Sequence, residues 1–129
     1  ITVEDANGRD RWKKLKDFSE LLAAKDLNKA LIFLNELNES GINVVQFTKD
    51  LIHYLRRVLS LKMNPGLEEL FQAELTNEDV LSLKNIGAQN TPDFFIKLLK
   101  SLIRSYADMR YSPFALVPLE VCVIENLKN

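Results

Sequence analysis

His53 and Cys122 are the one imidazole and the one thiol in this sequence. An imidazole transfers protons near neutral pH, and a thiolate is both a nucleophile and a metal ligand. His53 lies opposite the apolar stripe of its predicted helix, with no activated nucleophile beside it, so we interpret it as a solvated surface residue. Cys122 lies in an apolar segment, which predicts a buried, unreactive thiol. One histidine and one cysteine cannot form a zinc site. The phosphate-binding patterns GxxxxGKS/T and GxGxxG do not occur.

A basic cluster, RDRWKKLKD, occupies residues 9–17. Cations of this kind bind phosphate groups, and an indole such as that of Trp12 can stack on a base. Arg11, Lys13 and Lys14 are therefore candidate nucleic-acid contacts. Two aspartates interrupt the cluster, however, and its apolar residues fall on one side of a helix. We therefore favour a solvated helix face, with nucleic-acid contact as the alternative.

Glu120 is a single charge inside the apolar run of residues 114–124. A buried carboxylate without a partner costs several kcal/mol (roughly, in folded proteins), so it either reaches the rim of the helix or pairs with a cation. The candidate partners are Arg56, Arg104 and Arg110. An exposed position at the rim is the alternative.

The terminal helix around Glu120 is apolar on more than one side, which requires cover from more than one direction. Pro118 would break the interior of this helix, at a cost of roughly 3 kcal/mol. Since Ser112 and Pro113 already give a helix-start signal, we favour a kink or a later start, with 112–117 as a lead-in. The apolar residues of this terminal helix are Leu116, Val117, Leu119, Val121, Val123 and Ile124.

Helical periodicity dominates the rest of the chain, and strand alternation is hard to find. Capping residues predict helix starts at Asp26, Asn43, Thr76 and Thr91, and glycines predict helix ends at Gly41 and Gly87. We therefore predict an all-α fold, a single compact bundle of six or seven helices. The predicted helices are 10–24, 27–40, 44–63, 67–75, 77–86, 92–109 and a last one that begins near 112.

Length and composition limit the classes of protein to which the chain can belong. With 129 residues, 47% of them hydrophobic, it has the size of one domain with one core. Its charges are of both signs and its net charge is -1, which does not predict a nucleic-acid-binding protein. No apolar run approaches the ~20 residues of a membrane span. The opening ITVED is not a basic-then-apolar leader, so we predict no signal peptide. A single cysteine fits a reducing cytoplasm.

Two long stretches of the sequence carry a family resemblance. The segment DLNKALIFLNELNESGINVVQFTKDLIHYLRRVLSLK, Asp26–Lys62, resembles a helical hairpin and the following helix in the C-terminal collar domain (domain III) of the gamma/tau subunit of bacterial DNA polymerase III. The segment IRSYADMRYSPFALVPLEVCVIENL is similar to that family's closing pair of helices, with Pro118, Leu119 and Glu120 at its PLE position. The matching residues of the first segment are Asp26, Ala30, Leu31, Leu34, Leu37, Gly41, Phe47, Asp50, Leu51, Arg56 and Leu59.

The resemblance implies a clamp-loader collar, an oligomerisation domain that holds the loader subunits in a ring during ATP-dependent loading of the sliding clamp. Residues 1–8 would be a remnant of the preceding ATPase lid or linker, and 9–129 the helical domain. ATP and Mg would bind only in the ATPase modules, so this fragment would be no enzyme and hold no cofactor.

The same resemblance implies the partners. They would be other clamp-loader subunits, joined through their collar domains, and a small accessory subunit is a further candidate. DNA would be contacted only through the whole complex, which would be cytoplasmic. Glu120 would pair with an arginine of the same chain or of the next.

Two other readings stay open. The domain could be a helical adaptor that binds a partner helix or peptide in a groove between its helices. It could also be a ligand-binding regulator with a cavity near Trp12, Tyr54 and Tyr106.

Overall fold

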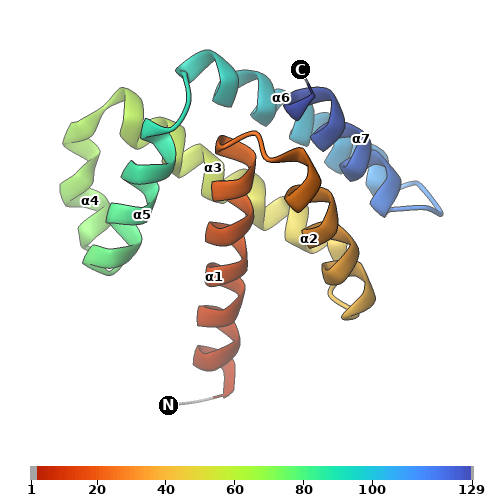
Figure 1. The fold of residues 1–129 in the computed structure, drawn as a ribbon. Coiled ribbons are helices and arrows are strands. Elements are labelled where there is room, and N and C mark those ends of the chain that lie inside the picture. The colour runs from red at the N-terminus through yellow and green to blue at the C-terminus, as the bar shows by residue number, and fades with distance from the viewer. Residues whose placement is uncertain (1–2, 129) are drawn as a thin grey trace.

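The computed structural model describes the backbone of residues 3–128 and the side chains of residues 8–128. Within these residues the chain forms the predicted all-α bundle, with seven α-helices and one short 3-10 helix, η1 (Figure 1). The elements are α1 (Val3–Ala23), α2 (Leu27–Glu39), α3 (Val44–Met63), η1 (Pro65–Leu67), α4 (Glu68–Gln72), α5 (Asn77–Ala88), α6 (Pro92–Met109) and α7 (Leu116–Leu127).

Helix α3 is the central element, because it packs against α1, α5, α6 and α7. A helix with neighbours on several sides must be apolar over much of its surface, and α3 buries residues at three- and four-residue spacing. The α4–α5 pair and the α6–α7 turn lie at opposite ends of the molecule (Figure 1). The buried residues of α3 are Val44, Phe47, Thr48, Leu51, Tyr54, Leu55, Val58 and Leu61.

Three phenylalanines join the first three helices. The ring of Phe18 on α1 stacks on that of Phe33 on α2, with the ring centroids 5.0 Å apart. It meets the ring of Phe47 on α3 edge to face at 5.9 Å. Since Phe18 and Phe47 are buried, each contributes about 1.5–3 kcal/mol of hydrophobic stabilisation.

The predicted helix starts are confirmed at all four capping residues. The hydroxyl of Thr76, for example, accepts a hydrogen bond from the backbone N–H of Asp79 at 3.0 Å. Gly41 follows the end of α2 with a φ of 85°, a conformation that costs other residues about 1–2 kcal/mol. The capping residues are Asp26, Asn43, Thr76 and Thr91.

Three predicted boundaries were wrong. Helix α1 begins at Val3 rather than near residue 10, because Gly8 lowers helix propensity without forbidding a helix. The predicted helix 67–75 is divided into η1 and the shorter α4. Gly87 does not end α5, which continues to Ala88. The boundary between residues 1–8 and 9–129 stays a prediction.

Gly87 is a site of close helix packing instead of a helix end. It is buried within α5, and a Cβ at this position would lie 3.5 Å from the Cβ of Lys62 and 3.5 Å from a methyl group of Val58 on α3. Helix α5 thus lies close enough to α3 for a methyl group at this position to be in ordinary van der Waals contact.

The later start of the last helix is confirmed. Helix α7 begins at Leu116, so Pro118 lies in its first turn, where a missing N–H breaks no helical hydrogen bond. In the preceding turn the hydroxyl of Ser112 accepts a hydrogen bond from the N–H of Phe114 at 3.0 Å. This turn reverses the chain direction, so that α7 packs against α6.

Candidate functional site

The two sides of α7 differ in what covers them. Leu119, Cys122, Val123 and Leu127 are buried against the bundle, and Leu116 is half-buried. The opposite side carries Val117, Val121 and Ile124, which we call the α7 stripe. Their side chains are 51%, 45% and 39% exposed, so the described part of the chain covers only one side of this helix.

The α6–α7 turn, which precedes the α7 stripe in the chain, carries two more exposed aromatic side chains. Tyr111 and Phe114 in that turn are 84% and 70% exposed, the highest values among the large apolar residues of the described chain. Scattered apolar residues are normal on a protein surface, whereas a contiguous group is typical of an interaction site. The terminal helix and its turn are therefore the first candidate for a subunit interface.

Glu120 is half-buried on the same helix. Within residues 8–128, the structure contains no ion pair between Glu120 and Arg56, Arg104 or Arg110. The guanidinium of Arg110 lies instead against the ring of Tyr106, 6.0 Å from its centroid. A pair between Glu120 and a cation of another subunit stays a prediction.

The two candidate reactive residues lie as expected. His53 is exposed on α3, and Cys122 is 2% exposed between α7 and the rest of the bundle. Burial raises the pKa of the Cys122 thiol, and the nearby side chains of Ser101 and Ser105 oppose this only in part. The thiol is therefore protonated and unreactive at neutral pH.

The cations of the basic cluster are paired within the chain. The ammonium of Lys13 lies 3.0 Å from Asp17, and that of Lys14 lies 3.4 Å from Asp10. The guanidinium of Arg11 approaches Asp50 at 3.9 Å. These contacts favour a solvated helix face, and nucleic-acid contact by Arg11, Lys13 and Lys14 stays a prediction.

Trp12, in the same basic cluster, packs against residues of α3. Its indole packs edge to face on the ring of Tyr54, 5.0 Å between centroids, and the guanidinium of Arg57 lies 5.7 Å from the indole centroid. The indole is therefore held by α3 and is not free to stack on a base.

Helix α6 carries a second group of cations that sequence reasoning did not single out as a group. Lys97, Lys100 and Arg104 are exposed and, among the side chains that the structure describes, none of them forms an ion pair. They line a groove of about 350 Å³ between α6 and α7, together with Asp93, Ile96, Ser101 and Glu125. The signal was present in their three- and four-residue spacing, which places them on one side of a helix.

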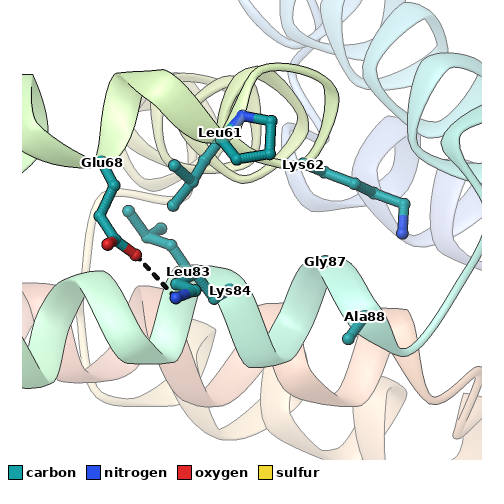
Figure 2. A pocket seen from close by; sticks show the side chains of 8 residues that line it. Leu61, Lys62, Glu68, Leu83, Lys84, Gly87 and Ala88 are labelled. Atoms are coloured by element: carbon teal, nitrogen blue, oxygen red, sulfur yellow. Dashed lines mark ion pairs between the residues drawn. The ribbon is translucent and has the colours of Figure 1, made fainter.

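A separate cavity of about 320 Å³ lies between the end of α3 and α5 (Figure 2). Leu61 and Leu83 form its apolar wall, and Lys84 pairs with Glu68 across it at 2.7 Å. Gly87 also lines this cavity. The cavity is partly open to solvent, and the residues around it have no catalytic arrangement.

Two further grooves lie along α1 and bear on the other readings. A groove of about 320 Å³ has an apolar wall formed by Leu15, Ile42 and Phe47. A smaller one, about 210 Å³, is lined by Trp12 and Tyr54 but not by Tyr106, so the three residues predicted to surround one ligand cavity do not meet.

Among the side chains that the structure describes, no three histidine, cysteine, aspartate or glutamate residues come together as metal ligands. No helix within residues 3–128 combines the length and apolarity that crossing a bilayer requires.

Two comparisons with known proteins match nearly the whole chain. The tau subunit of DNA polymerase III from Bacillus subtilis (strain 168) is 26% identical to this chain over 128 residues, which cover 97% of the chain. The chain spans 22% of the length of that protein. No solved structure matches this chain. The sequence profile of domain III of the DNA polymerase III subunits gamma and tau matches residues 8–128. Nearly the whole described chain therefore fits one domain, and the protein belongs to the family of DNA polymerase III subunits gamma and tau domain III.

Proposed function

We propose that this domain is a collar that joins clamp-loader subunits in a ring, with the α7 stripe as part of the contact. Two observations support the proposal. The chain belongs to a domain family of the gamma and tau subunits. Its last helix leaves Val117, Val121 and Ile124 exposed along one side.

The exposed stripe is the observation on which the proposal chiefly rests. A helix that packed only within its own bundle would need one apolar side, yet α7 has two. Burying the remaining apolar surface of the stripe against another subunit would contribute about 1 kcal/mol for each side chain. Tyr111 and Phe114 extend the same surface with aromatic side chains, which often dominate the energy of interfaces.

The chain spans about a fifth of the related tau subunit, so the activity of the whole protein is part of the proposal. The parent protein would bind and hydrolyse ATP in modules outside these residues and load the sliding clamp onto DNA in the cytoplasm. This domain would contribute no catalytic group to that reaction. Its role would be to hold the subunits together, with other collar domains as its partners.

Substitution on the α7 stripe tests the proposal. Sedimentation velocity and light scattering should show that this domain associates, either with itself or with the collar domains of other loader subunits. Val121→Asp should reduce the association, because a carboxylate would be buried in an apolar contact. Leu81→Asp on α5 is the matched control, since Leu81 is also about half exposed (55%) but lies outside the stripe.

Circular dichroism would show that both variants remain folded. A wild-type domain that stays monomeric at high concentration, alone and with other collar domains, would rule the proposal out. Equal association of the wild type and Val121→Asp would show that the interface lies outside the α7 stripe.

The adaptor reading keeps one specific observation in its favour. The groove between α1 and the start of α3 has the apolar wall of Leu15, Ile42 and Phe47 and would accept a few side chains of a helical peptide. The α7 stripe favours the collar, because an adaptor of this kind needs one groove and no second apolar surface.

A further inference from the structure

The groove between α6 and α7 has more cations than carboxylates along its lining. Lys97, Lys100 and Arg104 line it, against two carboxylates, Asp93 and Glu125. None of the three cations is paired in the part of the chain that the structure describes, whereas the cations of the basic cluster on α1 are. A surface whose cations lack partners in their own chain is suited to an acidic partner.

Apolar side chains lie on both sides of this groove. On α6, Ile96 and Ile103 are 40% and 55% exposed. On α7, Val121 lies one turn before Glu125, so the α7 stripe borders the groove. The partner should therefore be an amphipathic helix that combines carboxylates with an exposed apolar residue.

The chain itself carries such a surface on α2. Ile32 is 49% exposed, and Glu36 and Glu39 follow it at four and seven residues, on the same side of the helix. Lys29 lies one turn before Ile32. We call these four residues the α2 stripe. None of its three charged side chains is paired within residues 8–128.

Helix α5 is a poorer match to the groove. Its exposed leucine, Leu81, has one carboxylate beside it, Glu78, and also a lysine, Lys84. The lysine would face the cations of the groove, so α2 is the better complement.

We propose that copies of this domain join head to tail, with α2 of one copy lying antiparallel against α6 in the α6–α7 groove of the next. The proposal rests on the proposed collar function, and it names the second half of the contact and its direction. It also makes the interface heterologous, the type that closes into rings when the rotation allows it.

The antiparallel direction follows from the spacing of the charges. With Glu39 opposite Lys97, an α-helical rise of about 1.5 Å per residue places Glu36 opposite Lys100 with no offset. The same rise places Ile32 within about 1.5 Å of Ile103 along the axis.

Lys29, the first residue of the α2 stripe, also fits this alignment. Lys29 then falls within about 1.5 Å of Asp108 along the axis, and Asp108 is exposed and unpaired within residues 8–128. The parallel direction would bring Lys29 to Lys97 or Lys100 and would be disfavoured by like charge.

Charge reversal on each side of the contact tests the proposal. A groove variant carries Lys97→Glu and Lys100→Glu, and an α2 variant carries Glu36→Lys and Glu39→Lys. Sedimentation equilibrium should show that each variant alone self-associates at least about 100-fold more weakly than the wild type, because like charges then face each other. A control with the same number of reversed lysines, Lys25→Glu and Lys49→Glu, should associate as the wild type does.

Recombining the two changes is the decisive step. A chain with all four substitutions has lysines on α2 and glutamates in the groove, so its self-association should return. An equimolar mixture of the groove variant and the α2 variant should also associate, because every contact then joins opposite charges.

The remaining outcomes separate this inference from the proposed function. If the wild type associates and the α2 variant associates equally well, α2 is not part of the contact and the head-to-tail inference is overturned. If both variants fail and the fourfold variant stays monomeric, the pairing is wrong. If the wild type binds other collar domains but not itself, the collar function stands and the inference fails. Complete absence of association overturns both.

Discussion

Tyr54 places one polar group, its hydroxyl, inside the hydrophobic core. Its side chain is 1% exposed, and its hydroxyl oxygen finds no hydrogen-bond partner among the described residues. Burial raises the pKa of this hydroxyl, and the negative charges of Asp79, Glu20 and Asp17 raise it further. The group is therefore neutral and buried without compensation, which costs about 1–3 kcal/mol.

Removal of that hydroxyl should not destabilise the fold. For Tyr54→Phe we expect a free energy of unfolding that is unchanged or higher by up to about 1 kcal/mol. Chemical denaturation measures it. Asn90→Ala is the contrasting variant, since the Asn90 amide donates to the carbonyl of Ala23 at 3.1 Å and its oxygen accepts from Thr91 at 2.9 Å. That change should cost about 1–2 kcal/mol. A larger loss for Tyr54→Phe than for Asn90→Ala would contradict the assignment.

Asp79 is the residue whose ionisation is most clearly coupled to folding. Its carboxylate accepts a hydrogen bond from Arg9 at 2.9 Å, which joins the start of α5 to α1. Burial of Asp79 opposes ionisation, but the hydrogen bonds from Arg9 and Thr76 and the charge of Arg9 outweigh it and lower its pKa. Since the pKa of the folded state is below that of the unfolded state, the carboxylate stabilises the fold at neutral pH.

The stabilisation by Asp79 should disappear in acid. It is fully present above the unfolded-state pKa of about 4 and is lost as the pH falls through the lower pKa of the folded state. At pH 7, Asp79→Asn should lower the free energy of unfolding by about 1 kcal/mol, a modest value because Arg9 is largely exposed. Urea unfolding over a pH series should show the difference from wild type shrinking below pH ~4. A constant difference at every pH would show that the effect is not ionisation, and Asp108→Asn supplies the exposed control.

The two glycines near helix ends, Gly41 and Gly87, had been assigned the same role from sequence, and the structure separates them. Gly41 has a φ of 85° after α2, whereas Gly87 is helical and buried within α5. An added Cβ at Gly87 would make ordinary contacts, the nearest at 3.5 Å, and at Gly41 it would meet nothing within 4 Å. Backbone conformation, not space, therefore distinguishes the two positions.

Alanine at the two positions should have opposite effects on stability. Gly87→Ala should raise the free energy of unfolding by about 0.5–1 kcal/mol, because alanine favours the helix and fits the contact with α3. Gly41→Ala should lower it by about 1–2 kcal/mol, because the left-handed conformation strains any residue with a Cβ. Thermal and urea unfolding of both variants provide the comparison. Destabilisation by Gly87→Ala would show that the added methyl group does not fit against α3.

Helix starts could be predicted from sequence because each depends on a few neighbouring residues. Thr76 and Asp79 meet within a single turn, so their hydrogen bond follows from local spacing alone. The role of Gly87 could not be predicted, because the close approach of α5 to α3 joins residues far apart in the chain. The start of α1 was missed because Gly8 lowers helix propensity without forbidding a helix.

The candidate interface was predictable in part. The exposed side of α7 followed from the spacing of Val117, Val121 and Ile124, since a helix with two apolar sides needs two partners. The groove on α6 could not be found in the same way. Lys13 and Lys14 each pair with an aspartate four residues away, whereas Lys97 does not pair with Asp93 at the same spacing. Sequence spacing alone does not distinguish these cases.

Stability should vary strongly across the bundle as a consequence of how its helices are buried. Helix α3 contributes eight buried residues and contacts four other α-helices. The segment of η1 and α4 contributes no buried residue and lies at one end of the molecule (Figure 1). Segments with few buried contacts open locally, at free energies far below that of global unfolding.

Native-state hydrogen exchange should resolve these two behaviours. Backbone amides in the middle of α3, from Leu51 to Val58, should exchange only through global unfolding, at about 5–15 kcal/mol and with a steep dependence on denaturant. Amides of α4, which begins at Glu68, should exchange through local opening that is nearly independent of denaturant. Equal exchange energies and slopes for α3 and α4 would contradict this ranking and show that the bundle unfolds as one unit from end to end. Since the proposed contact joins α2 to α6 and leaves α4 outside it, assembly should slow exchange on the exposed sides of α2 and α6 while α4 continues to exchange as it does in the monomer.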